Sequence, residues 1–367
     1  MNVDVTFLRD VENGGQPDQP ARIAGKLADF ISATRTSLHV AIYDFRLREG
    51  EQPYNLVINA LKERAQAGVE IKIAYDSGKP GAVAAGGDPS PQGTAALLKQ
   101  AFGGTSVQVQ AVTDKNPEHG NARLMHNKYA IRDGATAAAA VWTGSANWTD
   151  DSWTFQENNL VQIASQELAG YYETDFQELF STGNLDSTGA NDRGSVQVDG
   201  DTWVDVAFSP GEGNTIDEEA SHLIQAATRR IKVASMLISS HHILYALQDA
   251  LRNRQAPEIT GIYDSTQMEQ TIENWKTIPH NVKYIDIFKE VVAGFASKAS
   301  IPYSPGGRHN FMHNKLVVCD DAVFMGSFNL SHSATMNAEN ALVIRNAAVA
   351  EQYSQYIDQL IGHYGKG

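Results

Sequence analysis

Two short stretches of the sequence carry residue types suited to nucleophilic and acid-base chemistry. In each, a histidine and a lysine stand two positions apart, an aspartate follows, and a Gly-Ser-x-Asn segment comes shortly afterwards. An imidazole can attack an electrophile or carry a proton, and an ammonium group can hold an anionic oxygen. The first copy comprises His126, Lys128, Asp133 and 144–147, and the second comprises His313, Lys315, Asp320 and 326–329.

Both stretches read as the start of a β-hairpin. Side chains alternate along a strand, so His126 and Lys128 project from the same face. Asp133 and Asp320 stand where a turn is expected, and the returning strand brings Gly-Ser-x-Asn back beside the histidine and lysine. A single His-x-Lys pair is usually an ordinary half-exposed pair on a strand. Two copies in the same order favour a shared active site instead.

The duplication extends beyond these motifs. The stretch 3–7 (VDVTF) returns at 204–208 (VDVAF), and 73–77 (IAYDS) returns at 261–265 (GIYDS). Each half alternates short apolar runs with amphipathic helical stretches, which predicts an α/β layer with parallel strands and crossovers. Residues 182–202 are rich in Gly, Ser, Asn and Asp. We therefore expect an N-terminal half over 1–181, a linker over 182–202 and a C-terminal half over 203–367.

With two His-x-Lys-x4-Asp motifs, each followed by Gly-Ser-x-Asn, the chain resembles the phospholipase D superfamily over nearly its whole length. The resemblance implies two α/β/α sandwich halves related by a pseudo-twofold axis. It also implies a phosphodiesterase reaction through a covalent phosphohistidine. No His, Cys and carboxylate cluster has metal-ligand spacing, so neither a metal nor a cofactor is expected.

The resemblance assigns roles to individual residues. One histidine attacks the phosphorus, and the other protonates the leaving oxygen and later activates water or an alcohol; family habit favours His126 as the nucleophile. Lysines and asparagines donate to the phosphoryl oxygens. The glutamate after Gly-Ser-x-Asn holds the second ring nitrogen of a histidine. The catalytic residues implied are His126, Lys128, Asn147, Glu157, His313, Lys315, Asn329 and Glu339.

Other residues are expected to support the site or to contact substrate. The supporting residues, which fix turns or make further hydrogen bonds, are Asp133, Ser145, Asp320 and Ser327. Trp148 is a substrate-binding candidate because it follows the first Gly-Ser-x-Asn, with a core position as the alternative. Arg308 and His309 are candidates because the irregular segment 295–310 runs directly into the second motif and should shape the substrate entrance. For Arg308 the alternative is a solvated loop surface.

Charge and composition limit the partners. The formal net charge of −14 disfavours broad nucleic-acid binding and adsorption to strongly anionic membranes. The single cysteine, Cys319, excludes an intrachain disulfide framework. We see neither a run of eighteen apolar residues nor a signal peptide, so a soluble chain is expected, with its compartment open. The fused duplication favours a monomer with no obligate protein partner.

The motifs recognise a phosphodiester without choosing between substrates. A phospholipid is the first hypothesis, favoured by the two motifs in one chain and by the acidity, with transient contact with a membrane surface. A metal-independent nuclease acting on DNA or RNA is the alternative, because 337–342 resembles the corresponding stretch of the nucleases in the superfamily, and because Gly144-Ser145 replaces the double glycine of secreted bacterial phospholipases. A catalytically silent scaffold protein is the third hypothesis, disfavoured because both motif sets are intact.

Overall fold

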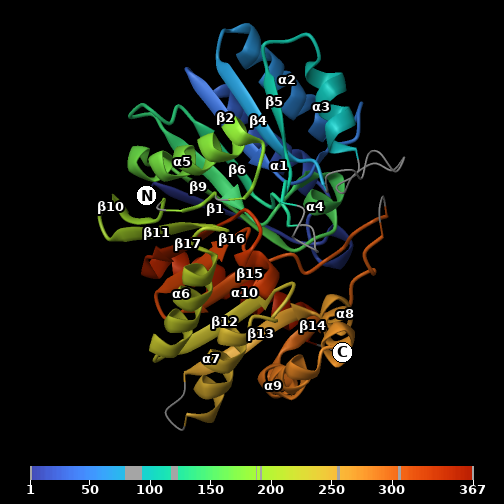
Figure 1. Cartoon of the computed structure of the whole chain (residues 1–367), viewed down its shortest axis with the longest axis vertical. Coiled ribbons are helices and arrows are strands. Elements are labelled where there is room, and N and C mark those ends of the chain that lie inside the picture. Colours follow the sequence, from blue (N-terminus) through green and yellow to red (C-terminus); the bar gives the residue numbers. More distant parts are fainter. Residues whose placement is uncertain are drawn as a thin grey trace.

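The computed structural model describes the chain in two stacked α/β units (Figure 1). It describes residues 2–78, 93–116, 123–186, 188–190, 192–253, 257–304 and 307–365. Each unit is built on one large sheet with helices on both faces, which confirms the predicted fold class. Within these residues, no helix is both long and apolar enough to cross a membrane.

The first sheet mixes parallel and antiparallel pairs. Three strands pair in parallel, as predicted, and the strands that carry the first motif pair antiparallel beside them. In spatial order they are β1 (Val3–Leu8), β9 (Asn158–Ile163), β7 (Ala140–Gly144), β6 (Lys128–Arg132), β2 (Ser37–Ile42), β4 (Glu70–Asp76) and β5 (Gln108–Val112). A two-stranded sheet, β3 (Phe45–Arg46) with β8 (Trp148–Thr149), lies apart from it.

The second sheet repeats this plan with one additional strand at its edge. Its order is β10 (Gly194–Asp199), β11 (Thr202–Ser209), β17 (Glu339–Arg345), β16 (Ala322–Gly326), β15 (Lys315–Cys319), β12 (Arg230–Ser235), β13 (Glu258–Asp264) and β14 (Ala296–Lys298). Strand β10 falls inside the segment predicted as a linker and pairs with β11. The linker expectation therefore missed a strand, which buries only Val196 and Val198.

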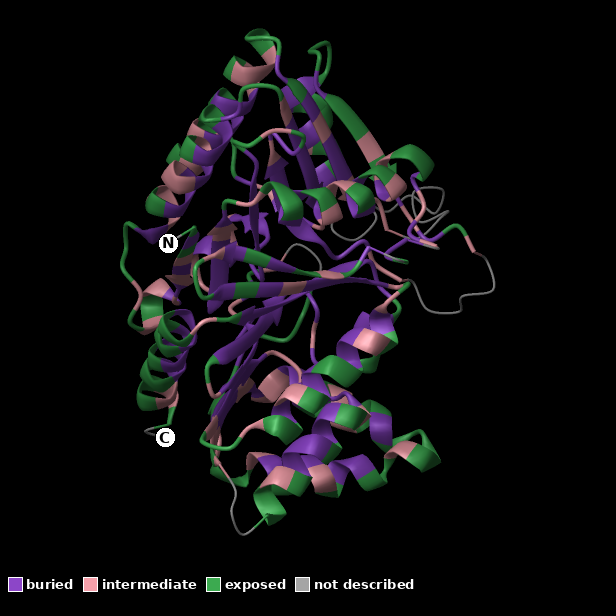
Figure 2. Ribbon diagram, turned by 90° about the vertical axis from the view of Figure 1, so that its left-hand side faces the viewer, coloured by how far each residue is buried: buried purple, intermediate pink, exposed green. Residues whose placement is uncertain are grey.

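Three hydrophobic cores hold the helices against the sheets (Figure 2). In the first unit, α1 (Gln19–Ser32), α2 (Gln52–Gln66) and α3 (Thr94–Phe102) share a core with one sheet face. In the second unit, α6 (Gly213–Ala226), α7 (His241–Arg252) and α9 (Lys283–Val291) do the same. Helices α5 (Gln166–Thr182) and α10 (Ala347–Tyr364) contribute to a central core that both units share. This shared core fixes one unit on the other.

Within the described residues, the other helices are α4 (Asp150–Thr154) and α8 (Ser265–Lys276), with 3-10 turns at Val11–Asn13, Pro279–Asn281, Val292–Gly294 and His332–Thr335.

The two motif segments cross from one unit to the other in a reciprocal pattern. Met125 bridges Ala338, and Met312 bridges Glu157. The main-chain N–H of His126 donates to the Ala338 oxygen at 2.8 Å, and that of His313 donates to the Glu157 oxygen at 3.0 Å. Each histidine is thus attached to the strand that belongs to the other half. This is the local form of the pseudo-twofold relation.

Candidate active site

His126 and His313 line one cavity between the units, and a buried lysine follows each of them two residues later. Lys128 begins β6 and Lys315 begins β15, and each histidine lies two residues earlier, on the same face. Both lysines are fully buried, and His126 and His313 are 7% and 6% exposed. The cavity has a volume of about 220 Å³. It is lined by Tyr43, Asp44, Arg46, Leu124, His126, Asn147, Thr149, Asp151, Gln156, Met236, Tyr303, His309, Phe311, His313 and Asn329.

His126 is held by a carboxylate from the other half of the chain. Its Nδ1 lies 2.7 Å from Oε2 of Glu339, which is fully buried. The other glutamate oxygen, Oε1, accepts a hydrogen bond from the Asn337 side chain at 3.1 Å. With Nδ1–H donated to the carboxylate, the lone pair of His126 resides on Nε2.

His313 is held by an amide instead. Its Nδ1 lies 3.0 Å from Oδ1 of Asn158, and the Ser145 hydroxyl donates to the same oxygen at 2.7 Å. Asn158, and not Glu157 as expected, therefore contacts a histidine ring. The physical reason is chain length. The connection from Gly-Ser-x-Asn to the following strand is one residue shorter in the second copy.

Main-chain pairing shows the correct alignment of the two copies. Ser145 N–H donates to the Asn159 oxygen, and Ser327 N–H donates to the Asn340 oxygen, both at 3.0 Å. Asn158 therefore corresponds to Glu339, and Glu157 corresponds to Ala338. An alignment anchored on the paired asparagines at 159 and 340, rather than on the glutamates, would have found Asn158 from the sequence.

The lysines and histidines strongly perturb one another. Burial lowers the pKa of Lys128 to about 7, although the charges of Glu339, Asp44 and Asp76 act in the opposite direction. Burial, reinforced by the Lys128 charge, holds the pKa of Lys315 well below its usual range. Each ammonium donates one hydrogen bond, at 2.6 Å, to the carbonyl of the histidine two residues earlier. An ammonium has three donors, so two remain for a ligand.

Burial and the two lysine charges also act on the imidazoles. Burial first, and then the lysines, hold the pKa values of His126 and His313 well below the ordinary range. Burial raises the pKa of Glu339 to about 8, with the Lys128 charge opposing the shift. These shifts favour neutral imidazoles in the empty cavity. An anion bound there would favour the protonated form of each lysine.

The two motif aspartates lie away from the cavity and anchor the chain. Asp133 accepts hydrogen bonds from the main-chain N–H groups of Arg35 and Thr36, and Asp320 accepts them from those of Arg229 and Arg230. Both aspartates adopt left-handed backbone angles, with φ of 52° and 51°. Each ties the turn after the motif strand to the loop before a neighbouring strand.

Two of the three substrate-binding expectations are not met. Trp148 is 1% exposed and packs edge-on against Phe45, with ring centroids 5.1 Å apart, so it belongs to the core. Arg308 does not line the cavity, because its guanidinium pairs with Glu12 and lies over the Phe155 ring. His309 does line the cavity.

His309 joins the entrance segment to the first unit. Its Nδ1 lies 3.1 Å from a carboxylate oxygen of Asp151, and its Nε2 lies 2.9 Å from the Ser304 carbonyl. Two acceptors facing both nitrogens favour the doubly protonated ring. In agreement, the Asp151 contact raises the pKa of His309.

Part of the cavity wall was missed by the sequence analysis. Arg46, held to Asp44 by hydrogen bonds of 2.6 and 2.7 Å, comes from the short strand β3. Tyr43 is close to the site as well, since its ring lies 5.0 Å from the Lys128 ammonium. These residues precede the first motif by about eighty positions and belong to no repeated pattern. Only the folded chain brings them to the histidines.

No group of three or more His, Cys, Asp or Glu side chains that could hold a metal ion occurs in the part of the chain that the structure describes.

Comparisons with known proteins bear on the family and the fold. A family model described as "Cardiolipin synthase, PLD-like domain" matches residues 27–180 and 221–361. A search of curated protein sequences found no match. Among solved structures, phosphatidylserine synthase of Haemophilus influenzae Rd KW20 is 11% identical, with a TM-score of 0.63, and the match covers 98% of this chain and 86% of that one. At this identity the likeness is one of fold.

Two smaller structures match about one half of the chain. NucT from Helicobacter pylori is 21% identical with a TM-score of 0.36, covering 49% of this chain and 96% of its own. Nuc from Salmonella typhimurium, described as a phospholipase D family member, is 22% identical with a TM-score of 0.32, covering 43% and 93%. The family match spans both halves and most of the sequence. The chain therefore belongs to the phospholipase D superfamily, as its motifs predicted.

Proposed function

We propose that the protein is a metal-independent phosphodiesterase that cleaves or transfers a phospholipid phosphodiester through a covalent phosphohistidine. One observation carries the proposal: two imidazoles, one from each half, line the same small cavity, and the buried lysine of each motif donates to the carbonyl of its histidine. One phosphoryl group placed there meets a nucleophile, an acid and several donors at once.

The first step forms a bond between Nε2 of His126 and phosphorus and breaks the bond from phosphorus to the leaving oxygen. His313 keeps its Nδ1 proton on Asn158, takes up a second proton on Nε2 when the anionic phosphodiester binds, and passes that proton to the leaving oxygen. In the second step His313 takes a proton from water or an alcohol, whose oxygen attacks phosphorus while the P–N bond breaks. Lys128, Lys315 and the Asn147 and Asn329 amides donate to the non-bridging oxygens, where negative charge is held in the transition state.

The asymmetry of the two ring partners favours His126 as the nucleophile. A phosphoryl group on Nε2 makes the ring cationic while Nδ1 keeps its proton. A positive ring favours the ionised form of Glu339, and the carboxylate, 2.7 Å from Nδ1, then stabilises the ring through a charge-assisted hydrogen bond. The neutral Asn158 amide orients His313 without stabilising a positive ring to the same degree. A histidine held in this way is better suited to give up a proton.

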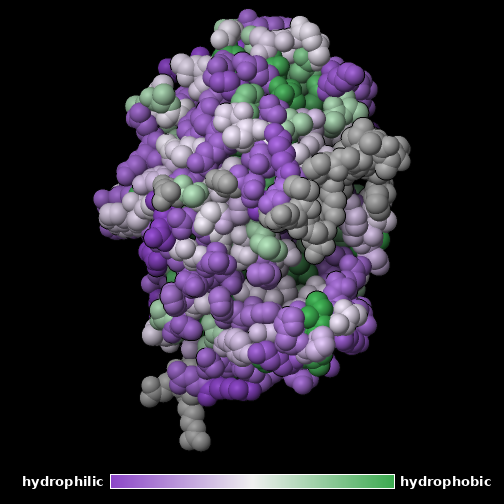
Figure 3. Space-filling model, viewed as in Figure 1, coloured by the Kyte–Doolittle hydropathy of each residue, from purple (hydrophilic) through white to green (hydrophobic). Residues whose placement is uncertain are grey.

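Three observations support a lipid substrate. The matching family model is named for a cardiolipin synthase. The cavity wall includes apolar and aromatic side chains at Tyr43, Leu124, Met236 and Phe311. The surface seen in Figure 3 is mostly hydrophilic, and the net charge is −14, which opposes the approach of a polyanion.

The entrance segment adds a local feature suited to a lipid surface. Ile301 and Tyr303 are 43% and 49% exposed beside the cavity that Tyr303 helps to line. Exposed apolar and aromatic side chains of this kind can enter the boundary region of a lipid surface. A nuclease remains the alternative, because the same phosphoryl site accepts any diester.

The test is a substrate panel in excess EDTA. Phosphatidylcholine micelles, single-stranded DNA, RNA and bis(p-nitrophenyl) phosphate are incubated with the protein and with H126N, and products are measured. Release of phosphatidic acid that is lost in H126N and varies little with salt supports the lipid proposal. Cleavage of nucleic acid that weakens steeply with salt establishes the alternative. Silence on all four substrates would refute an enzymatic role.

A further inference from the structure

Glu157, which the sequence suggested as a histidine partner, has a different set of contacts. It joins the two ends of residues 299–311, here called the entrance loop. Its side chain binds Lys298, directly before the loop, with 2.6 Å between Nζ and Oε2. Its main-chain N–H donates to the carbonyl of Phe311, at the end of the loop, at 3.2 Å. One residue of the first unit thus holds both ends of a loop of the second.

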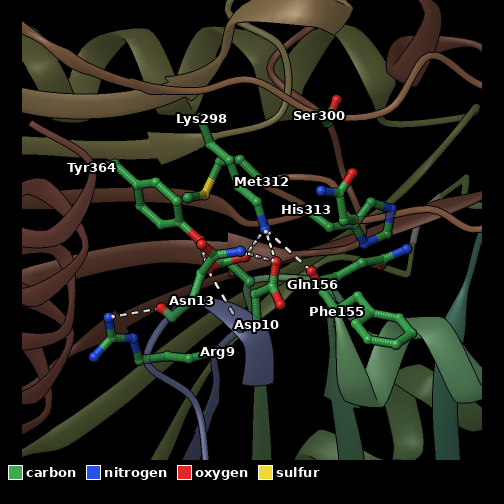
Figure 4. Close-up of polar contacts among 12 residues, drawn as sticks. Arg9, Asp10, Asn13, Phe155, Gln156, Lys298, Ser300, Met312, His313 and Tyr364 are labelled. Carbon is green, nitrogen blue, oxygen red and sulfur yellow. Dashed lines mark hydrogen bonds and ion pairs between the residues drawn. The ribbon is translucent and has the colours of Figure 1, made fainter. Parts of the chain in front are cut away.

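The Lys298–Glu157 pair is the centre of a buried charge cluster. Figure 4 labels its members Lys298, Asp10 and Tyr364. Lys298 Nζ also lies 3.1 Å from Oδ2 of Asp10 and donates to the Phe155 carbonyl at 3.1 Å. The Tyr364 hydroxyl donates to the other Glu157 oxygen at 2.5 Å. Lys298 is 2% exposed, and Asp10 and Glu157 are fully buried. The members come from the N-terminal segment, the turn before β9, strand β14 and the end of α10.

The cluster connects directly to His313. The Glu157 carbonyl accepts the His313 N–H at 3.0 Å, and the next residue, Asn158, holds the His313 ring. A displacement of Glu157 must therefore move both the main chain and the ring acceptor of the histidine. His126 has a different neighbour, because the residue corresponding to Glu157 is Ala338, which has no polar side chain.

A second carboxylate, that of Asp264, also contacts both ends of the entrance loop. One oxygen of Asp264 accepts from the Ser300 hydroxyl at 2.7 Å, and the other accepts from the Met312 N–H at 3.0 Å. In the first unit, Asp76 accepts from the Met125 N–H at 2.9 Å in the same way. The Asp264 contact is thus common to both halves, whereas the Lys298 cluster belongs to the His313 side.

A buried ion pair of this kind is poorly explained as a source of stability. Desolvating the charges offsets most of their attraction, and apolar residues of equal volume often stabilise as well or better. The pair constrains geometry instead, because its hydrogen bonds form only when the four chain segments adopt one relative arrangement. A directional constraint is useful where a reacting group must be held to a fraction of an ångström.

We propose that Glu157 and Lys298 are positioning residues for His313: their buried ion pair, completed by Asp10 and Tyr364, fixes both ends of the entrance loop and thereby the imidazole that acts as acid and base. The proposal rests on the proposed function for the role of His313. It assigns the Glu157–Lys298 pair to the positioning of His313 and not to that of His126.

The test compares K298M, E157Q, the double variant E157Q/K298M and Y364F with the wild type. K298M leaves two carboxylates buried without their cation, whereas E157Q keeps an acceptor for Lys298 and leaves Asp10 as the counter-charge. R252M, which breaks the exposed Arg252–Glu290 pair of the same unit, is the matched control. Each variant is assayed for kcat and KM on bis(p-nitrophenyl) phosphate and by ¹⁵N NMR of the histidine rings.

We expect K298M to lower kcat roughly tenfold to a hundredfold with little change in KM. Its His313 ring resonances should shift while those of His126 stay in place. E157Q and Y364F should lose less, and the double variant should recover part of the loss because one unpaired charge is removed. R252M should behave as the wild type does.

A purely structural role would give a different pattern. K298M would then melt at a lower temperature, while kcat per folded molecule and the His313 resonances stay unchanged, and that result overturns the proposal. If K298M does not fold, kcat and the His313 resonances of Y364F and E157Q, compared with those of R252M, test the proposal in its place. If the wild type cleaves no diester, the proposed function fails, and the His313 resonances alone still test the positioning of the ring.

Discussion

Replacing Glu339 by glutamine should disable His126 by forcing the wrong tautomer. Asn337 donates its side-chain N–H to Oε1 of Glu339 at 3.1 Å. In E339Q the amide oxygen stays at that position, because only an oxygen can accept this bond. The amide nitrogen then faces Nδ1 of His126, where it donates, so the ring proton moves to Nε2. A protonated Nε2 has no lone pair with which to attack phosphorus.

The structure sets the size of the loss and a way to reverse it. The corresponding amide substitution in serine proteases, which also fixes the wrong tautomer, lowers kcat by about 10⁴. In N337D/E339Q the carboxylate introduced at position 337 accepts from the amide N–H introduced at position 339, which turns the amide oxygen back toward His126. Only the charge-assisted part of the original bond is then missing, about 1–1.5 kcal/mol, or roughly tenfold.

The assay is the rate of the first p-nitrophenolate release from bis(p-nitrophenyl) phosphate in single-turnover measurements. This leaving group needs no acid, so the attack by His126 is isolated from the later release step. Ring ¹⁵N shifts report the tautomer directly, and N337D alone is the control for the added carboxylate. The Ser327 hydroxyl also contacts Glu339 but can rotate to donate or accept, so it does not fix the amide. A loss of less than tenfold in E339Q, or no recovery in the double variant, would refute the reasoning.

Three further predictions concern pH and stability. Above about pH 7, kcat/KM should fall because Lys128 in the free enzyme loses its proton. The value of kcat should fall only at higher pH, because bound phosphate keeps the lysine charged. Both are measured as pH–rate profiles, and a flat profile to pH 9 contradicts them. W148A should lower the free energy of unfolding by about 3–5 kcal/mol in urea denaturation with KM unchanged, because Trp148 is buried in the core. A raised KM at full stability would instead indicate that Trp148 contacts the substrate. D320A should lose about 1–3 kcal/mol with kcat retained, because its carboxylate binds main-chain N–H groups away from the cavity; a kcat loss without destabilisation would argue otherwise.

The sequence sufficed for everything that depends on local pattern and repetition. Strand alternation placed each histidine beside its lysine, and duplication indicated a shared fold and family, which the two sheets and the family match confirm. Local pattern did not identify the residue of the first half that contacts the His313 ring. Whether Glu157 or Asn158 reaches His313 depends on a one-residue difference in a connection, and a shift of one residue along a strand reverses the side-chain direction.

The missed parts of the wall share a second cause. Arg46 lies on a two-residue strand that pairs with β8, far along the sequence, and Asp44 directly precedes that strand. No periodicity marks such a short pair. Trp148, the β8 residue directly after Gly-Ser-x-Asn, was expected near the substrate but packs into the core. Strand β10 has too few apolar residues to stand out from a linker.

The duplicated halves have diverged at the positions that matter for chemistry. One imidazole has a buried glutamate, and the other has an asparagine and, behind it, the Lys298 cluster. The two halves thus give the imidazoles two different environments, which the proposed mechanism assigns to attack and to proton transfer.

The central claim is that His126 forms a bond to phosphorus while His313 moves the protons. H313N is incubated with bis(p-nitrophenyl) phosphate, quenched with base and digested, and the peptides are examined by mass spectrometry. Since release of the intermediate needs the base that H313N lacks, the account predicts a phosphoryl adduct on the peptide containing His126, and none in H126N. An adduct on His313 in H126N, or turnover in H313N at the wild-type rate with no adduct, would contradict it.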